Sequence, residues 1–146
     1  MNLTVDASVF VASARITESE YPTSRRFLQQ ARSVAAVLFC PILVLPECAA
    51  AIARATGDPM LAQELVGLIE SFPMLSLVPL DQRLTRRAVR IAATYQLRGA
   101  DSIYVAVAEV RNATLITWDT EMIERGSHSA SVMTPSMWLE RHAVAE

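Results

Sequence analysis

The sequence predicts an α/β fold, a three-layer α/β/α sandwich with a central, mostly parallel sheet. Short apolar runs typical of strands alternate with segments of helical periodicity along the chain. Parallel strands need crossover connections, and the predicted helices supply them. Of the 146 residues, 52% are hydrophobic and 19% charged, which is enough apolar material for a core. We therefore expect residues 1–146 to form a single domain.

The predicted strands are short apolar segments that each lead into a turn or a helix. They are Asn2–Val5, Ala35–Phe39, Leu75–Leu80, Thr114–Thr117 and, as a shorter fifth, Val132–Met133. Because helices connect these strands, we expect their carboxyl ends at one edge of the sheet. Open α/β sheets place their functional sites along that edge.

The predicted helices fill the intervals between the strands. They are Thr23–Arg32, Val44–Thr56, a helix from Pro59 through Phe72, a helix capped by Asp81 and running through Tyr95, a helix capped by Asp101 and running through Val110, and a last helix from Pro135. Their apolar residues recur at spacings of three and four, as on one face of a helix. We expect Gly57 to end the second helix and Gly99 the fourth.

Composition also restricts where the protein works. Every apolar run is interrupted well before the ~20 residues that a membrane span needs. Met1–Val5 resembles a first strand rather than a signal peptide, so we expect a cytoplasmic protein with no membrane contact. Cys40 and Cys48 lie in apolar sequence and are expected to be free thiols. His128 and His142 lack a metal-ligand spacing, which disfavours zinc.

Acidic residues in apolar surroundings are the most informative feature of the chain. Glu47 separates two apolar runs, Val37–Pro46 and Cys48–Ala53. An unpaired buried charge costs on the order of several kcal/mol, so Glu47 needs a partner. Three further acids share this setting: Asp6, Asp101 and Asp119. Because no matching cations accompany these acids, they suggest a metal ion, and hard carboxylate oxygens favour Mg²⁺ or Mn²⁺.

Each of these acids also has an explanation without a metal. An aspartate that precedes a helix can cap it, which applies to Asp6, Asp101 and Asp119. Glu47 could instead face solvent on an amphipathic helix, although its neighbours offer little polar surface. Asp6 and Asp119 converge if their strands are neighbours in the sheet. Asp101 joins them only if its loop folds back to the same edge.

A carboxylate-bound Mg²⁺ or Mn²⁺ suits phosphodiester hydrolysis, because it polarises the phosphoryl oxygen and lowers the pKa of a bound water. All 13 basic residues are arginine, which binds phosphate in bidentate geometry, although genomic base composition explains this equally well. Arg83, Arg86, Arg87 and Arg90 have helical spacing and could form one RNA-binding face or a solvated one. The net charge of −2 argues against a generic nucleic-acid coat.

Four short motifs occur in a fixed order along almost the whole chain. They are Val5-Asp6-Ala7-Ser8, Pro46-Glu47, Ala100-Asp101-Ser102-Ile103-Tyr104-Val105-Ala106 and Thr117-Trp118-Asp119. In this combination, and in a chain of this size, they resemble the PIN domain, specifically the VapC-type toxin ribonucleases of type II toxin–antitoxin systems.

The resemblance implies a PIN-like sandwich, Mg²⁺- or Mn²⁺-dependent endoribonuclease activity on RNA, and inhibition by a cognate antitoxin. By position, the catalytic and metal-binding acids would be Asp6, Glu47, Asp101 and Asp119. Ser8 and Thr117 match hydroxyl positions that support such a site as orienters. Trp118 stands where smaller or polar residues are frequent, which leaves the shape beside Asp119 open. The apolar-rich surface expected from this composition favours a homodimer.

Other classes fit the sequence less well. A receiver domain would need a lysine near its phosphoacceptor, and this chain has none. A haloacid-dehalogenase-like phosphatase would carry a second aspartate where Ser8 stands. Glu121 is left out of the site, because Glu121, Glu124 and Arg125 resemble a short solvated helix. The remaining alternative is a catalytically inactive PIN-like module that binds RNA or protein.

Overall fold

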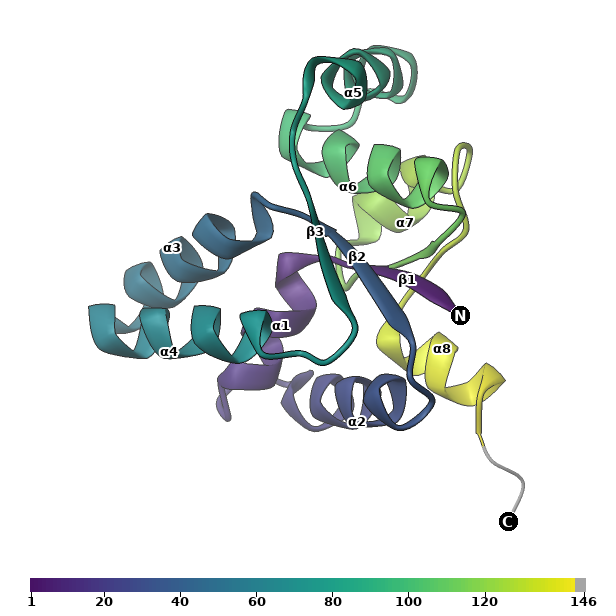
Figure 1. Cartoon of the computed structure of the whole chain (residues 1–146). Helices are drawn as coiled ribbons and strands as arrows, with labels where there is room; N and C mark the ends of the chain where they lie inside the picture. The colour runs from purple at the N-terminus through teal and green to yellow at the C-terminus, as the bar shows by residue number, and fades with distance from the viewer. Residues whose placement is uncertain (144–146) are drawn as a thin grey trace.

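The computed structural model describes residues 1–143, which form a central sheet with helices on both faces (Figure 1). Its strands are β1 Asn2–Val5, β2 Val37–Pro41, β3 Leu75–Val78, β4 Thr114–Ile116 and β5 Val132–Met133. The strand order is β3-β2-β1-β4-β5, and every neighbouring pair is parallel. The predicted α/β sandwich with a parallel sheet is therefore confirmed.

Helices connect each strand to the next, and a last helix follows β5. They are α1 Ala7–Ala14, α2 Tyr21–Ser33, α3 Val44–Thr56, α4 Pro59–Glu70, α5 Gln82–Tyr95, α6 Gly99–Val110, α7 Thr120–Gly126 and α8 Pro135–Arg141. In Figure 1, α5 and α6 lie above the sheet, and α1, α2 and α8 lie below it. The antiparallel pair α3 and α4 projects to one side and contacts α1.

α6 is the most deeply buried helix, since all its residues from Tyr104 to Ala108 are buried. It packs on β1, β2 and β4, the middle of the sheet. An all-round apolar helix is stable only where other elements cover it. Its first turn, which contains Asp101, is thereby held in one place relative to the strands.

Most helix ends follow the signals in the sequence. Gly57 has a φ of 70° and ends α3, as predicted, because that left-handed conformation strains other residues. Asp81 caps α5, as predicted, and its carboxylate accepts a hydrogen bond from the backbone N–H of Leu84. Cys40 and Cys48 are buried free thiols, also as predicted. Within residues 1–143, no helix is long and apolar enough to cross a membrane.

Two predictions about the segment between α5 and α6 were wrong. α5 ends at Tyr95, with Gln96 in the left-handed conformation at a φ of 57°, and does not continue to Gly99. Asp101 does not cap α6, because the helix already begins at Gly99. The buried side chain of Leu97, 6% exposed, gives the physical reason. The chain leaves the helix early to bury this leucine, and its gain in apolar burial outweighs the conformational cost at Gln96.

Candidate active site

Asp6 directly follows β1, and its side chain is only 6% exposed. Its Oδ2 accepts hydrogen bonds from the hydroxyls of Ser8, at 2.7 Å, and Thr117, at 2.9 Å. Although Asp6 occupies the N-cap position of α1, its side chain makes no capping hydrogen bond. Helix capping therefore does not explain why a carboxylate is buried here.

The loop after β4 is tied to the end of β1. The two strands are neighbours, with Val5 opposite Ile116, and the Asp6 N–H donates to the Ile116 carbonyl at 3.0 Å. The Ser8 Oγ accepts from the N–H of Trp118 at 3.1 Å, across this junction. Asp6 and Asp119 were expected to converge if their strands were neighbours. The strands are neighbours, so this condition is met.

Asp119 uses its two carboxylate oxygens differently. Oδ1 caps α7 by accepting from the N–H groups of Glu121, at 2.9 Å, and Met122, at 3.1 Å. Oδ2 accepts from Nη2 of Arg98 at 3.0 Å. The helix-cap explanation thus applies to one oxygen of Asp119 and leaves the other available to the site.

Asp101 lies in the first turn of α6, where its Oδ2 accepts from Nε of Arg98 at 3.1 Å. Arg98 therefore bridges Asp101 and Asp119. The two partners differ in exposure, because the Arg98 side chain is 68% exposed and that of Asp101 is 16% exposed. The loop before α6 has folded back to the sheet edge that carries Asp119.

Glu47, in the first turn of α3, finds its partner on α6. The hydroxyl of Tyr104 donates to Oε1 of Glu47 at 2.7 Å, and Tyr104 is fully buried. Burial raises the pKa of Tyr104 far above its usual range, so the phenol keeps its proton and remains a donor. This hydrogen bond is a specific contact that a purely solvent-facing glutamate would lack.

Burial raises the pKa values of Asp6, Glu47 and Asp101, and repulsion from neighbouring acids adds to the rise for Glu47 and Asp101. Burial raises the pKa of Asp6, and the hydroxyls of Ser8 and Thr117 offset part of the rise. Burial also raises the pKa of Glu47, the hydrogen bond from Tyr104 lowers it, and the negative charges of Asp6 and Asp101 raise it further. Ionising these carboxylates at this sheet edge therefore costs free energy.

The same effects connect Asp101 to the other acids. Burial raises its pKa most, Arg98 opposes the rise, and the charges of Asp119 and Asp6 add to it. The described structure therefore brings the sequence-predicted acids into one electrostatically coupled group. One exposed arginine neutralises only part of the negative charge in this group.

The donor set has the chemistry that a hard divalent cation prefers, since it consists of carboxylates with hydroxyls nearby. Within residues 1–143, however, no three Asp, Glu, His or Cys side chains stand together as a ready metal-binding group. All four acids already bond to other side chains. Glu47 bonds Tyr104, and Asp101 and Asp119 bond Arg98. The residue types fit a Mg²⁺ or Mn²⁺ ion that would draw them together.

Sequence reasoning missed Arg98 and Tyr104, although both stand three residues from Asp101. On a helix this spacing places side chains on one face, which is the signal that could have found Tyr104, whereas Arg98 precedes α6 with an extended backbone. It also left the role of Trp118 open. The Trp118 indole N–H donates to the hydroxyl of buried Ser24 at 2.8 Å, which anchors the loop beside Asp119 to α2.

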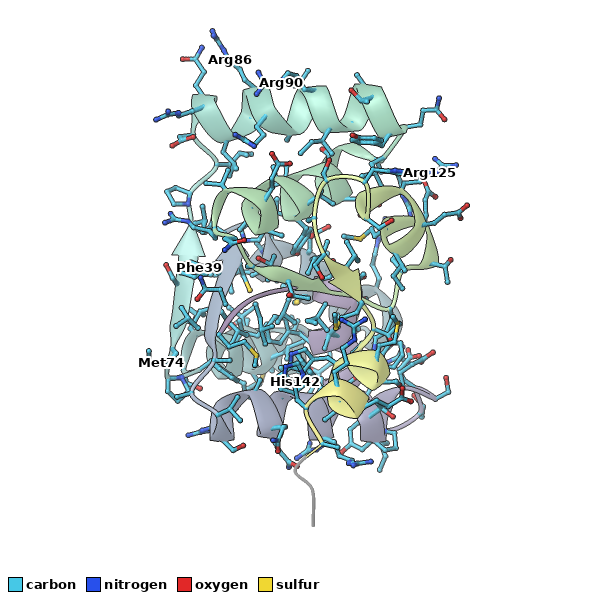
Figure 2. All side chains as sticks on the ribbon, turned by 90° about the vertical axis from the view of Figure 1, so that its right-hand side faces the viewer. Phe39, Met74, Arg86, Arg90, Arg125 and His142 are labelled. Carbon is cyan, nitrogen blue, oxygen red and sulfur yellow. The ribbon has the colours of Figure 1, made fainter. Side chains whose placement is uncertain are left out.

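The four arginines of α5 do not all share one environment. Arg83, Arg86 and Arg90 are exposed, and Figure 2 shows Arg86 and Arg90 pointing away from the helix into solvent. Arg87 instead turns to α6 and forms an ion pair with Glu109. α5 lies on the far side of α6 from the sheet (Figure 1). Arg87 therefore differs from the three exposed arginines of this helix. Within residues 1–143, no ion pair joins any of the four arginines to the four acids.

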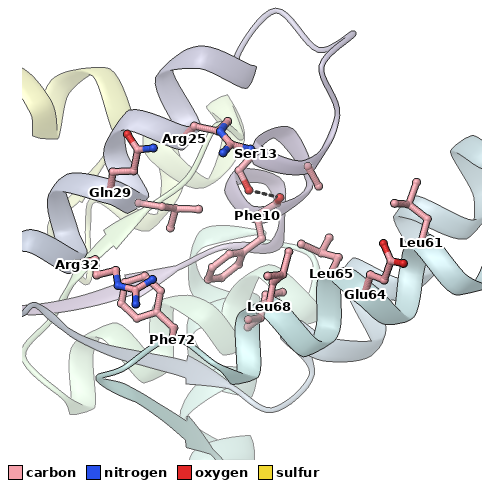
Figure 3. Close-up of a pocket in the computed structure, with 13 residues that line it drawn as sticks. Phe10, Ser13, Arg25, Gln29, Arg32, Leu61, Glu64, Leu65, Leu68 and Phe72 are labelled. Carbon is pink, nitrogen blue, oxygen red and sulfur yellow. Dashed lines mark hydrogen bonds between the residues drawn. The ribbon is translucent and has the colours of Figure 1, made fainter.

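A groove of about 400 Å³ lies between α1, α2 and α4 (Figure 3). Apolar side chains from all three helices form most of its lining, among them Phe10, Leu28, Leu65, Leu68 and Phe72. Leu68 is 68% exposed. Arg25 and Arg32 extend from α2 along one wall, so the apolar lining has a basic border on that side.

Comparisons with known proteins agree with this fold. The family model described as PIN domain matches residues 3–127. No curated protein matches the sequence. Similar solved structures include VapBC2 from Rickettsia felis bound to a DNA fragment from its promoter, with a TM-score of 0.71 and 12% identity over 92% of this chain and 98% of that chain.

Two further structures show the same likeness. VapC20 from Mycobacterium tuberculosis, described as a Sarcin-Ricin loop cleaving toxin, has a TM-score of 0.68 and 16% identity over 81% of this chain and 90% of that chain. FitAcB from Neisseria gonorrhoeae has a TM-score of 0.68 and 19% identity over 93% of this chain and 99% of that chain. At these identities the structures show a shared fold. Because the family model spans most of the sequence, the chain belongs to the PIN domain family.

Proposed function

We propose that the protein is a Mg²⁺- or Mn²⁺-dependent endoribonuclease that acts as the toxin of a toxin–antitoxin pair. The observation that carries this proposal is the coupled group of acids at the carboxyl edge of the sheet. Its members are Asp6, Glu47, Asp101 and Asp119. Membership of the PIN family supports a nuclease, and the likeness to VapC20, described as a Sarcin-Ricin loop cleaving toxin, supports RNA as the substrate class.

The four acids would hold the divalent ion, and other residues would orient them. Ser8 and Thr117 fix Oδ2 of Asp6 through two hydrogen bonds, and Tyr104 fixes Glu47. Such partners of metal ligands typically change metal affinity or activity by about 10–100-fold when removed. A bound ion supplies Lewis-acid polarisation of the phosphodiester and a lower pKa for the attacking water.

RNA would approach this edge as a polyanion. Arg83, Arg86 and Arg90 are exposed on α5 and are our candidates for contacts with the phosphate backbone at a distance from the cleaved bond. Arg87 is a weaker candidate, because Glu109 already neutralises it. Contacts of this kind would strengthen RNA binding without taking part in hydrolysis.

The proposed partner is a small antitoxin protein. A similar structure from Klebsiella pneumoniae is described as a toxin-antitoxin complex, with a TM-score of 0.59. We propose that an apolar segment of the antitoxin covers the groove between α1, α2 and α4, with acidic residues facing Arg25 and Arg32. A homodimer is the second assembly that we propose, on the ground of composition.

The experiment is single-turnover cleavage of RNA by antitoxin-free protein, with Mg²⁺ or Mn²⁺ and with a chelator. Glu47→Gln keeps the side-chain volume and removes the charge, so it should reduce the cleavage rate at least about a hundredfold, more than loss of an orienting partner would. Glu124→Gln is the matched control, since Glu124 is exposed on α7, and it should cleave like the wild type.

Two outcomes would count against the proposal. Cleavage by Glu47→Gln at the wild-type rate would remove the metal-binding acids from the reaction. No metal-dependent cleavage by the wild type on total RNA would favour the inactive binding module instead. RNA affinity measured on the same preparations shows whether the variant has lost the reaction or only its substrate.

A further inference from the structure

Arg98 holds an unusual position for an exposed arginine. Its guanidinium spans two acids of the site, with Nε on Oδ2 of Asp101 at 3.1 Å and Nη2 on Oδ2 of Asp119 at 3.0 Å. Within residues 1–143, no other basic side chain forms an ion pair with any of the four acids. Arg98 is therefore the internal counterion of the site.

The two ends of this residue are held very differently. Its backbone is extended, with φ −61° and ψ 152°, and is anchored by the buried neighbour Leu97 and by the start of α6. Its side chain is 68% exposed. Exposed ion pairs contribute little to protein stability in general, so such a guanidinium can change partners without disturbing the fold.

Most of the acceptor capacity of the Asp119 carboxylate is already in use. Its Oδ1 already accepts two backbone N–H groups at the start of α7. Oδ2 is the less occupied oxygen, and it is the atom that Arg98 binds. A divalent ion on the same oxygen would lie close to the Arg98 guanidinium, and repulsion between the two cations would disfavour binding of both at once.

Resting on the nuclease function proposed above, we propose that Arg98 is a built-in counterion that exchanges partners. It holds Asp101 and Asp119 in the metal-free protein, leaves them when a divalent cation binds, and then contacts a phosphate of the bound RNA. Anchored at the sheet edge, the freed guanidinium remains beside the acids, where the scissile phosphate must lie. The metal ion and RNA then strengthen each other's binding, because each favours the same released position of Arg98.

The first test measures Mn²⁺ binding to metal-free protein by titration calorimetry, without RNA. Arg98→Gln removes the competing cation, so Mn²⁺ should bind about three- to tenfold more tightly than to the wild type. Arg98→Lys keeps the charge but loses the fork geometry, and its affinity should fall between the two. Arg54→Gln removes an exposed charge from the last turn of α3 and should leave the affinity unchanged.

The second test uses an uncleavable, 2′-O-methylated RNA with Mn²⁺ present. Arg98→Gln should bind this RNA more weakly than the wild type, and the slope of log affinity against log salt should fall by about 1. The opposite signs of the two effects are diagnostic. A residue that merely supported the loop would weaken metal and RNA binding together.

The outcomes separate this inference from the proposed function. If the wild type binds Mn²⁺ and Arg98→Gln binds it equally well or more weakly, the inference is overturned. The proposed nuclease function is unaffected by that result. Unchanged RNA affinity in Arg98→Gln would overturn the transfer of Arg98 to phosphate. No Mn²⁺ binding by the wild type would overturn the proposed function and the inference together.

Discussion

The acid site and the groove between α1, α2 and α4 are built on opposite principles. At the acid site, charge lies where water is scarce, as with Asp6 at 6% exposed. In the groove, apolar surface lies where water is abundant, as with Leu68 at 68% exposed. Both arrangements raise the free energy of the folded chain when it has no ligand or partner. The acid site does so through desolvated charge, and the groove does so through exposed apolar area. The proposed cation would offset the first penalty, and the proposed apolar partner would offset the second.

The two regions also differ in how closely their geometry is specified. Directional hydrogen bonds from Ser8, Thr117 and Tyr104 orient the carboxylates. The groove relies on apolar contact, which is non-directional and scales with area. We therefore expect the acid site to be sensitive to single-atom changes and the groove to be sensitive mainly to charge and bulk. Variants in the two regions should affect different activities.

The largest effect is expected for Leu68→Asp, which should weaken antitoxin binding without changing the acid site. The position is exposed in the isolated protein, so the folded state should tolerate the carboxylate. Under a bound antitoxin the new charge would be buried without a partner, and affinity should fall about a hundredfold. RNA cleavage should stay at the wild-type rate, because the groove takes no part in it.

Met60→Asp is the matched control for this measurement. Met60 lies on the same helix, is 71% exposed and does not line the groove. Antitoxin affinity, measured by titration calorimetry, should be close to wild type for this variant. If Leu68→Asp and Met60→Asp bound antitoxin equally well, the groove would not be the antitoxin site.

A smaller effect is expected on the stability of the metal-free protein. The pKa of Asp6 is raised on folding, so the folded state keeps a proton that the unfolded state has lost as pH rises through this window. Its contribution to stability is complete below the unfolded pKa and is lost as pH rises through the folded pKa. Asp6→Asn should therefore raise Tm by roughly 2–4 °C at neutral pH and show less decline from acidic to neutral pH.

Scanning calorimetry in a chelating buffer measures this difference. The amide of asparagine retains an acceptor for Ser8 and Thr117, so the variant mainly removes the charge. A Tm that is lower than wild type at neutral pH and equal at acidic pH would mean that the carboxylate is stabilising. That result would contradict the contrast between strained acids and a passive groove.

The smallest effect is expected on α5. Arg86→Gln removes an exposed charge and should weaken RNA binding about threefold, whereas Arg87→Gln removes a charge already paired with Glu109 and should change it less. Affinity measured over a range of salt concentrations tests both variants. Identical salt slopes for wild type and Arg86→Gln would assign this helix face to solvent.

Much of the fold could be predicted because hydrophobic periodicity is strong and local. The strand Asn2–Val5 and the helix Val44–Thr56 have the predicted bounds. The junction after α5 could not be predicted, because the gain from burying Leu97 exists only once the sheet is assembled. Tertiary packing there overrode the glycine signal at Gly99.

The candidate site was predictable only in part, for a related reason. A charge in an apolar run is visible in the sequence, which is how Asp6 and Glu47 stand out. Their partners depend on strand order and loop path, and Tyr104 lies 57 residues from Glu47. The spacing of arginines predicts a shared helix face. It could not reveal that Arg87 faces a neighbouring helix and Arg86 faces solvent.

The most direct test of the central idea, that these acids form a divalent metal centre, is the Tm of wild type and Asp6→Asn with and without Mn²⁺. An ion that binds only the folded state adds about 2.7 kcal/mol at a hundredfold excess over its Kd, so Mn²⁺ should raise the wild-type Tm clearly. The rise should be much smaller in Asp6→Asn, so that the order of the two Tm values expected without metal is reversed when Mn²⁺ is present. Equal rises in the two proteins, or none in the wild type, would contradict a metal centre at Asp6.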